Sequence, residues 1–134
     1  MQIAVVGIVV FNDECLFLKR NNPPHNWCPP CGRVEKEETF IFALQREIKE
    51  ETALDVKIID LPVEVWEGTH DDKKTISITY VCQAQSKKAG LSHEHSHFCW
   101  IKISDLIKST INTNFTTEKW PLWIETANFY FSRK

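Results

Sequence analysis

The feature of this sequence that most constrains its fold is an apolar run close to its start. Residues 3–11 are nearly all apolar, and most of them are β-branched. A strand with one exposed face alternates apolar and polar side chains, whereas a strand covered on both faces is apolar throughout. We therefore expect residues 3–11 to form a central strand of a layered fold. A turn follows at 12–14, and residues 15–20 are expected to return as the second strand of a hairpin.

The remainder of the chain is expected to supply further strands and two substantial helices around this hairpin. Residues 21–32 contain four prolines, which predict a stiff loop without regular structure. A helix is expected from Thr39 to Thr52, with Thr39 as its N-cap. Further strands are expected at 56–59, 63–66, 75–83 and 98–103, a short helix at 104–107, and a terminal helix at 117–132 with Pro121 in its first turn. Such a pattern predicts a sheet between layers of helix in a single domain spanning residues 1–134.

Composition excludes several classes of protein. The chain is 43% hydrophobic and 25% charged, which is typical of a globular domain, and its net charge is −2. A binder of nucleic-acid polymers or of a membrane surface needs a basic face, so neither is expected as a partner. The longest apolar run falls well short of the roughly 20 residues that span a bilayer. Five cysteines, an odd number without regular spacing, indicate free thiols and a cytoplasmic location.

Acidic residues are concentrated in the predicted helix 39–52 and just before it. Six of the twelve glutamates lie between residues 35 and 51. At about 100° per residue, the apolar stripe of the helix comprises Phe40, Ala43, Leu44 and Ile48. Glu47 and Glu51 point along this stripe and Glu50 borders it. The opposite face, expected to be wet, comprises Gln45, Lys49 and Thr52.

Carboxylates on a packing face repel one another and resist desolvation. One resolution is a hard divalent cation such as Mg²⁺, which is bound by a few carboxylates together with water and substrate phosphates. The other is that the second half of the helix emerges into solvent, with Arg46 and Lys49 as partners of the acids. The helical wheel alone leaves both open.

The segment around these glutamates resembles the signature of the Nudix hydrolases. That signature is Gly, five residues, Glu, seven residues, Arg-Glu, an aliphatic residue, any residue, Glu-Glu, any residue, Gly and an aliphatic residue. The matching residues between positions 32 and 54 are Gly32, Glu38, Arg46, Glu47, Ile48, Glu50, Glu51 and Leu54. Ala53 replaces the second glycine. Residues 27–35 also resemble a common family segment, with Cys31 in place of a glycine, and Glu37 stands where glycine is frequent.

The resemblance implies an α+β fold of the MutT-like kind, an α/β/α sandwich with a mixed β-sheet between helices. It implies hydrolysis of a phosphoanhydride by water with Mg²⁺, or Mn²⁺, as the cofactor. The implied metal ligands are Glu47, Glu50, Glu51 and a backbone carbonyl near Cys31. Gly32 would hold a tight turn, and Arg46 would orient the glutamates and form an ion pair with Glu38. The general base is either a helix glutamate or Glu94.

The expected substrate is a small nucleotide, with a nucleoside triphosphate favoured over other nucleoside diphosphate derivatives. Candidate contacts to it are Arg20, Trp27 and Arg33. The segments expected to select the substrate are the loops 21–31, 67–74 and 85–97. The sequence leaves open whether the protein is a monomer or a homodimer.

Two alternatives to a Nudix enzyme remain open at this point. A related domain could bind a nucleotide without cleaving it. The second alternative is a zinc protein, since Cys28 and Cys31 together with His93, His95 and His97 provide zinc-binding atoms. The cysteine pair and the histidines lie about 60 residues apart in the chain, so their spacing alone does not bring them together. A Cys-x-x-Cys pair is also a redox motif.

Overall fold

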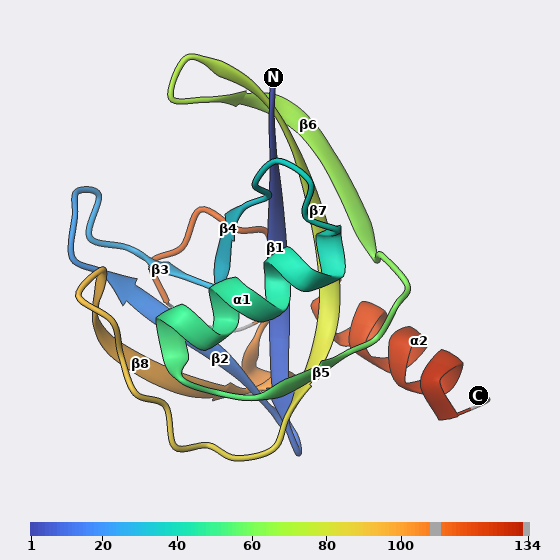
Figure 1. Ribbon diagram of the computed structural model, residues 1–134. Helices are drawn as coiled ribbons and strands as arrows, with labels where there is room; N and C mark the ends of the chain where they lie inside the picture. Colours follow the sequence, from blue (N-terminus) through green and yellow to red (C-terminus); the bar gives the residue numbers. More distant parts are fainter. Residues whose placement is uncertain (108–110, 133–134) are drawn as a thin grey trace.

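A mixed β-sheet lies between two helices in the computed structural model, which describes residues 1–107 and 111–132 (Figure 1). Helix α1 (Phe40–Thr52) covers one face of the sheet and helix α2 (Trp120–Ser132) covers the other. The sheet is built around β1 (Gln2–Phe11) and β7 (Lys73–Ala84), which run parallel to each other. Every other pairing recorded between strands of this sheet is antiparallel.

The remaining strands extend the sheet on both sides of this central pair. Strand β2 forms the expected hairpin with β1, and β3 and β8 pair with β2. Strand β4 pairs with the first half of β1, and β5 and β6 pair with β7. The bounds are β2 Glu14–Arg20, β3 Trp27–Cys28, β4 Cys31–Arg33, β5 Val56–Ile58, β6 Glu64–His70 and β8 His95–Lys102. A 3-10 helix, Ile103–Asp105, follows β8.

Strand β1 is covered on both faces, as its continuous apolar run predicts. Val5 and Val9 belong to the core beneath α1, whereas Ile8 and Val10 belong to the core beneath α2. Each buried side chain of this size stabilises the fold by about 1.5–3 kcal/mol. In the second core, Phe17 stacks on a tryptophan of α2, Trp120, with ring centroids 5.3 Å apart and an angle of 9° between the rings.

Helix α1 begins and ends close to the predicted positions. Thr39 is the N-cap, and its Oγ1 accepts a hydrogen bond from the N–H of Phe42 at 3.2 Å. The helix ends at Ala53, whose φ of 60° is left-handed. Two wheel assignments were wrong. Phe40 is exposed because it stands at the helix start, beyond the edge of the core. Thr52 is fully buried, one turn after Ile48 on the same side, and its hydroxyl donates to the Ile48 carbonyl at 2.6 Å.

Two segments expected to be loops contain strands. Strands β3 and β4 lie on either side of Pro29 and Pro30. They form because the residues that flank the prolines keep N–H groups, and these strands pair with β2 and β1. Residues 67–74 form the end of the β6–β7 hairpin. Its turn residues Asp71 and Asp72 have φ of 52° and 61°, as a two-residue hairpin turn requires.

The C-terminal part of the chain follows the prediction with shifted boundaries. Strand β8 begins at His95, three residues earlier than expected, and the 3-10 helix replaces the short helix expected at 104–107. Helix α2 begins at Trp120, with Pro121 in its first turn. Neither of the described helices has the length and apolar character needed to cross a membrane.

Candidate active site

The last two turns of α1 place three acidic side chains in different surroundings. Glu51 is buried, with only 4% of its surface exposed, Glu47 is half-buried and Glu50 is exposed. Oε1 of Glu51 accepts a hydrogen bond from the backbone N–H of Cys31 at 3.1 Å. Burial, followed by repulsion from Cys31 and Glu47, raises the pKa of Glu51 to about 10. Burial also raises the pKa of Glu47. Two neighbouring acids therefore face the protein rather than bulk water.

Arg46 connects the segment before α1 with the acids of the helix. Its Nε and Nη2 donate to Glu38 at 2.7 and 2.8 Å, and its Nη1 donates to Glu47 at 2.8 Å. Nη2 also donates to the carbonyl of Arg33 at 3.1 Å. The hydrogen bonds from Arg46 are the main reason that the pKa of Glu38 is lowered. Arg46 thus forms the ion pair expected with Glu38 and at the same time fixes one oxygen of Glu47.

Gly32 is required by space rather than by a turn. A Cβ added to Gly32 would lie 2.0 Å from Cδ of Glu47, far inside van der Waals contact. Neither Gly32 nor Cys31, which replaces a glycine of the family pattern, adopts a positive φ. Gly32 lies within β4, paired with Val5, and not in the tight turn expected for it. The left-handed conformations occur instead at Glu37 (φ 71°) and Ala53 (φ 60°), where the family pattern has glycine.

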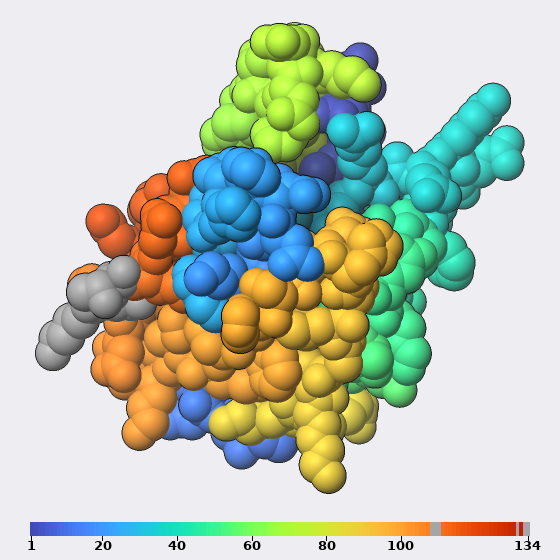
Figure 2. Space-filling view, turned by 90° about the vertical axis from the view of Figure 1, so that its left-hand side faces the viewer, coloured from blue at the N-terminus to red at the C-terminus, as the bar shows by residue number. Residues whose placement is uncertain are grey.

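A small cavity of about 160 Å³ lies next to the buried carboxylate of Glu51. Its lining residues are Arg20, Asn22, Cys28, Cys31, Glu51, Glu94 and His95. The loop after β2 meets the segment before β8 here, because the N–H of Asn21 donates to the carbonyl of Glu94 at 3.0 Å. Figure 2 shows these segments, in blue and in orange-yellow, against each other on one face of the molecule. The structure thus brings Arg20, Cys31 and Glu94 to the same cavity as Glu51.

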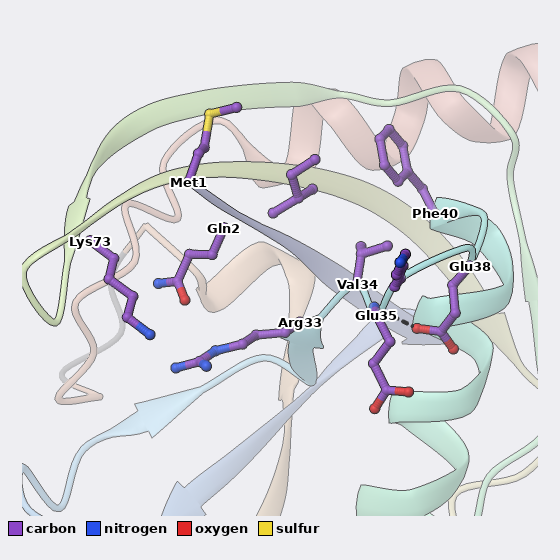
Figure 3. Close-up of a pocket in the computed structure, with 10 residues that line it drawn as sticks. Met1, Gln2, Arg33, Val34, Glu35, Glu38, Phe40 and Lys73 are labelled. Atoms are coloured by element: carbon purple, nitrogen blue, oxygen red, sulfur yellow. Dashed lines mark hydrogen bonds between the residues drawn. The ribbon is translucent and has the colours of Figure 1, made fainter.

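The other two residues expected to contact substrate lie elsewhere. Trp27 is half-buried and packs against the core beneath α2, with the ammonium of Lys19 6.0 Å from its ring centroid. Arg33 lines a separate, larger groove of about 710 Å³, where Figure 3 shows its side chain extending to the same end as Lys73. Sequence reasoning missed Lys73 because it lies at the start of β7, far from the motif in the chain.

The histidines do not assemble the zinc site considered from the sequence. His93 and His97 are exposed, whereas His95 is buried with its Nε2 4.0 Å from the sulfur of Cys28. Among residues 1–107 and 111–132, no three His, Cys, Asp or Glu side chains are placed to hold a metal ion together. His93 lies before β8 begins, and a register shift in the pairing with β2, between Lys19 and Arg20, falls between His95 and His97.

The acids of α1 are better suited to Mg²⁺ than the cysteines and histidines are to zinc. Mg²⁺ takes only one or two protein carboxylates and completes its shell with water and phosphate. Within the described part of the chain, no lysine or arginine lies within ion-pair distance of Glu51. The ion-pair contact recorded for its Oε2 among the described residues is with Nε2 of His95, at 4.0 Å; burial lowers the pKa of that histidine, so its charge is disfavoured. A divalent cation would supply the positive charge that Glu51 lacks.

Comparison with known proteins identifies the family and the fold. The model of the NUDIX domain matches residues 1–122. The chain is 29% identical to the asymmetrical bis(5'-nucleosyl)-tetraphosphatase of Caenorhabditis elegans, over 81% of this chain and 85% of that protein. It is 39% identical to an ADP-ribose pyrophosphatase of Methanocaldococcus jannaschii, over 59% of this chain and 48% of that protein.

Solved structures show the same fold. The Ap4A hydrolase binary complex from C. elegans superimposes with a TM-score of 0.77 at 22% identity, covering all of both chains. A NUDIX-family hydrolase from Clostridium perfringens gives a TM-score of 0.77 at 19% identity, covering 96% of this chain and 97% of that one. The α+β sandwich with its mixed sheet is therefore the Nudix fold. The chain belongs to the Nudix family and is a hydrolase acting on acid anhydrides.

Proposed function

We propose that this protein is a Mg²⁺-dependent pyrophosphohydrolase. It cleaves a phosphoanhydride bond of a nucleoside triphosphate, or of another nucleoside diphosphate derivative, by attack of water. The observation that carries this proposal is the burial of Glu51, 4% exposed and without a lysine or arginine partner in the described residues, beside the second acid Glu47. A buried acid at this position costs stability unless a cation compensates it.

The metal ligands in this proposal are Glu47, Glu50, Glu51 and the backbone carbonyl of Cys31. Glu50 is exposed at the rim and is assigned a contact through water. When bound, Mg²⁺ neutralises charge on the phosphate oxygens, and Mn²⁺ is expected to substitute for it. Arg46 keeps one oxygen of Glu47 engaged and thereby fixes the direction of the other.

Arg20 and Glu94 face the same cavity as Glu51 and have complementary roles in this proposal. The guanidinium of Arg20 binds a phosphate of the substrate, for which its planar donors are well suited. Glu94, exposed at the rim, is one candidate to accept the proton of the attacking water, and a helix glutamate is the other. Replacing Glu94 by Gln separates the two, since only the first assignment predicts a large loss of turnover.

The substrate is proposed to be a small nucleotide that extends from the acids towards the larger groove. Arg33 lines this groove and follows Gly32 directly in β4, and Lys73 adds a second cation at the same end. The named relatives act on a dinucleoside tetraphosphate and on ADP-ribose, whose phosphate chains join two groups. Neither a nucleic-acid polymer nor a membrane is assigned as a partner, and a cytoplasmic location is proposed.

The test is a substrate panel with product analysis in the presence of Mg²⁺. The panel contains nucleoside triphosphates, ADP-ribose and a dinucleoside tetraphosphate, and hydrolysis in ¹⁸O-water reports which phosphorus is attacked. Glu51→Gln should lower turnover by about two orders of magnitude or more, with the fold unchanged. Glu125→Gln, an exposed acid on α2, is the matched control. Nucleotide binding by the wild type without any hydrolysis would indicate a binding module instead.

A further inference from the structure

Two thiols that the proposed hydrolysis does not use lie beside the acids. Cys28 ends β3 and Cys31 begins β4, with only Pro29 and Pro30 between them. Both cysteines are free, and both line the cavity of about 160 Å³. Pairing with β2 and β1 holds each strand, opposite Leu18 for Cys28 and opposite Val6 for Cys31. The fold therefore holds the two cysteines at the same cavity.

The thiol pair is connected directly to Glu51. The backbone N–H of Cys31 is the hydrogen-bond donor to Oε1 of Glu51, at 3.1 Å. The sulfur of Cys28 lies 4.0 Å from Nε2 of His95, and that nitrogen lies 4.0 Å from Oε2 of Glu51. All four residues line the cavity of about 160 Å³, so a small molecule in that cavity meets the thiols as well as the acid.

We propose that Cys28 and Cys31 are a reversible oxidation site, at which a peroxide-class oxidant converts the dithiol into a disulfide and thereby impairs the hydrolytic site around Glu51. The second half of this proposal rests on the proposed function, whereas the first half does not.

The chemistry balances with hydrogen peroxide as the only added reactant. One sulfur attacks a peroxide oxygen, the O–O bond breaks, and the sulfur becomes a sulfenic acid while the first water leaves. The other sulfur then displaces the sulfenic oxygen, which leaves as the second water with the remaining thiol proton. Two electrons pass from the sulfurs to the peroxide. A dithiol reductant reverses the result by exchange.

The disulfide would act on Glu51 through the backbone. Two free thiols must approach to a covalent distance of about 2 Å, which shifts Cys28 and Cys31 relative to each other. Cys31 supplies the N–H that holds Glu51, and displacement of a catalytic group by about 1 Å can cost 10²-fold in rate. The other cysteines lack this position. Cys15 and Cys82 are fully buried, and Cys99 packs against the core beneath α2.

The test compares the full chain, reduced and after hydrogen peroxide, by intact mass, peptide mapping and hydrolysis. We expect a loss of two hydrogen atoms, a crosslinked peptide joining Cys28 to Cys31, and turnover lower by about tenfold or more that a dithiol restores. Cys28→Ser should form no such link. After peroxide treatment it should retain the turnover that the same variant shows before treatment. Cys99→Ser, the matched control, should respond as the wild type does.

Three outcomes would overturn the proposal. One is the absence of the crosslink at an excess of peroxide, and another is oxidation to separate sulfinic acids. A crosslink without any change in turnover would overturn the coupling to Glu51. If the reduced protein hydrolyses no substrate of the panel, the proposed function fails, and the mass and the peptide map still decide the oxidation site.

Discussion

The guanidinium of Arg46 donates two parallel hydrogen bonds to the carboxylate of Glu38, from Nε at 2.7 Å and from Nη2 at 2.8 Å. Glu38 lies before α1 begins and Arg46 lies in its middle, so this pair anchors the entry segment to the helix. The remaining nitrogen of Arg46, Nη1, donates to Glu47 at 2.8 Å. The direction of Glu47 therefore depends on Glu38, although the two acids do not share a hydrogen bond.

Arg46→Lys tests this dependence. Lysine keeps the positive charge, but a single ammonium cannot reproduce the planar fork that serves Glu38 and Glu47 together. We expect turnover in Mg²⁺ to fall about tenfold to a hundredfold, with an unchanged circular dichroism spectrum. Lys49→Arg, an exposed position on the same helix, is the control and should retain wild-type turnover. Full activity of Arg46→Lys would show that Glu47 needs no such support.

Gly32→Ala tests the close approach of β4 to α1. The new Cβ would occupy space 2.0 Å from Cδ of Glu47, so the acid must move. We expect turnover to fall by about two orders of magnitude and the free energy of unfolding to decrease by about 1–3 kcal/mol. Both are measurable, by steady-state hydrolysis and by urea unfolding.

Gly90→Ala is the matched control for Gly32→Ala. A Cβ at Gly90 meets only the Cβ of Ala53, at an ordinary contact distance of 3.4 Å, and Gly90 has no positive φ. It should change neither quantity measurably. Equal effects of the two substitutions would mean that the space around Glu47 is not what makes Gly32 necessary.

Glu38 should contribute to the stability of the protein in a pH-dependent way. The hydrogen bonds from Arg46, and then that from the N–H of Glu35, lower the pKa of Glu38 in the folded state. A carboxyl with a lowered folded pKa stabilises the fold fully above its unfolded pKa of about 4.3, and this contribution is lost as the pH falls through the folded pKa. Glu38 therefore stabilises the fold at neutral pH and loses this effect in acid.

Glu38→Gln should thus be less stable than the wild type at pH 7, and the difference should shrink as the pH falls below about 4. Urea unfolding of both proteins from pH 7 to pH 3 measures it. Glu125→Gln, which alters an exposed acid on α2, should track the wild type at every pH. A difference between Glu38→Gln and the wild type that stays constant with pH would assign the effect to shape rather than to charge.

Sequence patterns predicted those parts of the fold that depend on residues close together in the chain. The apolar run of β1 required two covered faces, and Val9 and Ile8 do pack on opposite sides. The hydroxyl of Thr39 predicted the start of α1 because an N-cap depends only on its neighbours in the chain. The wheel also indicated that Glu51 turns inward, although it carried no information about which groups meet that carboxylate.

The errors concern contacts between distant segments. The helical wheel placed Thr52 on the wet face, yet it is packed inside the fold, where its hydroxyl is satisfied by the carbonyl of Ile48. The strand at Trp27 forms by pairing with β2, which no local pattern around the prolines reveals. Arg20 and Glu94 share a cavity through loop contacts that the sequence does not encode at any fixed spacing.

Ala53→Gly tests whether the helix end carries backbone strain. Ala53 ends α1 with a φ of 60°, a left-handed conformation that costs a residue with a Cβ about 1–2 kcal/mol and costs glycine almost nothing. Glycine also makes the unfolded chain more flexible, which offsets about 0.4–1 kcal/mol of that gain. We expect a net increase of about 0.5–1 kcal/mol in the free energy of unfolding, seen as a higher urea midpoint with an unchanged slope.

Ala43→Gly provides the opposite case within the same helix. Ala43 is fully buried in the interior of α1, where the backbone is regular, so the same change should lower the free energy of unfolding by about 1 kcal/mol or more. The sign of the effect thus separates left-handed strain from the general cost of glycine. If both substitutions destabilise the protein, the left-handed conformation at Ala53 is not strained, and the alanine that replaces the family's glycine there has no energetic cost.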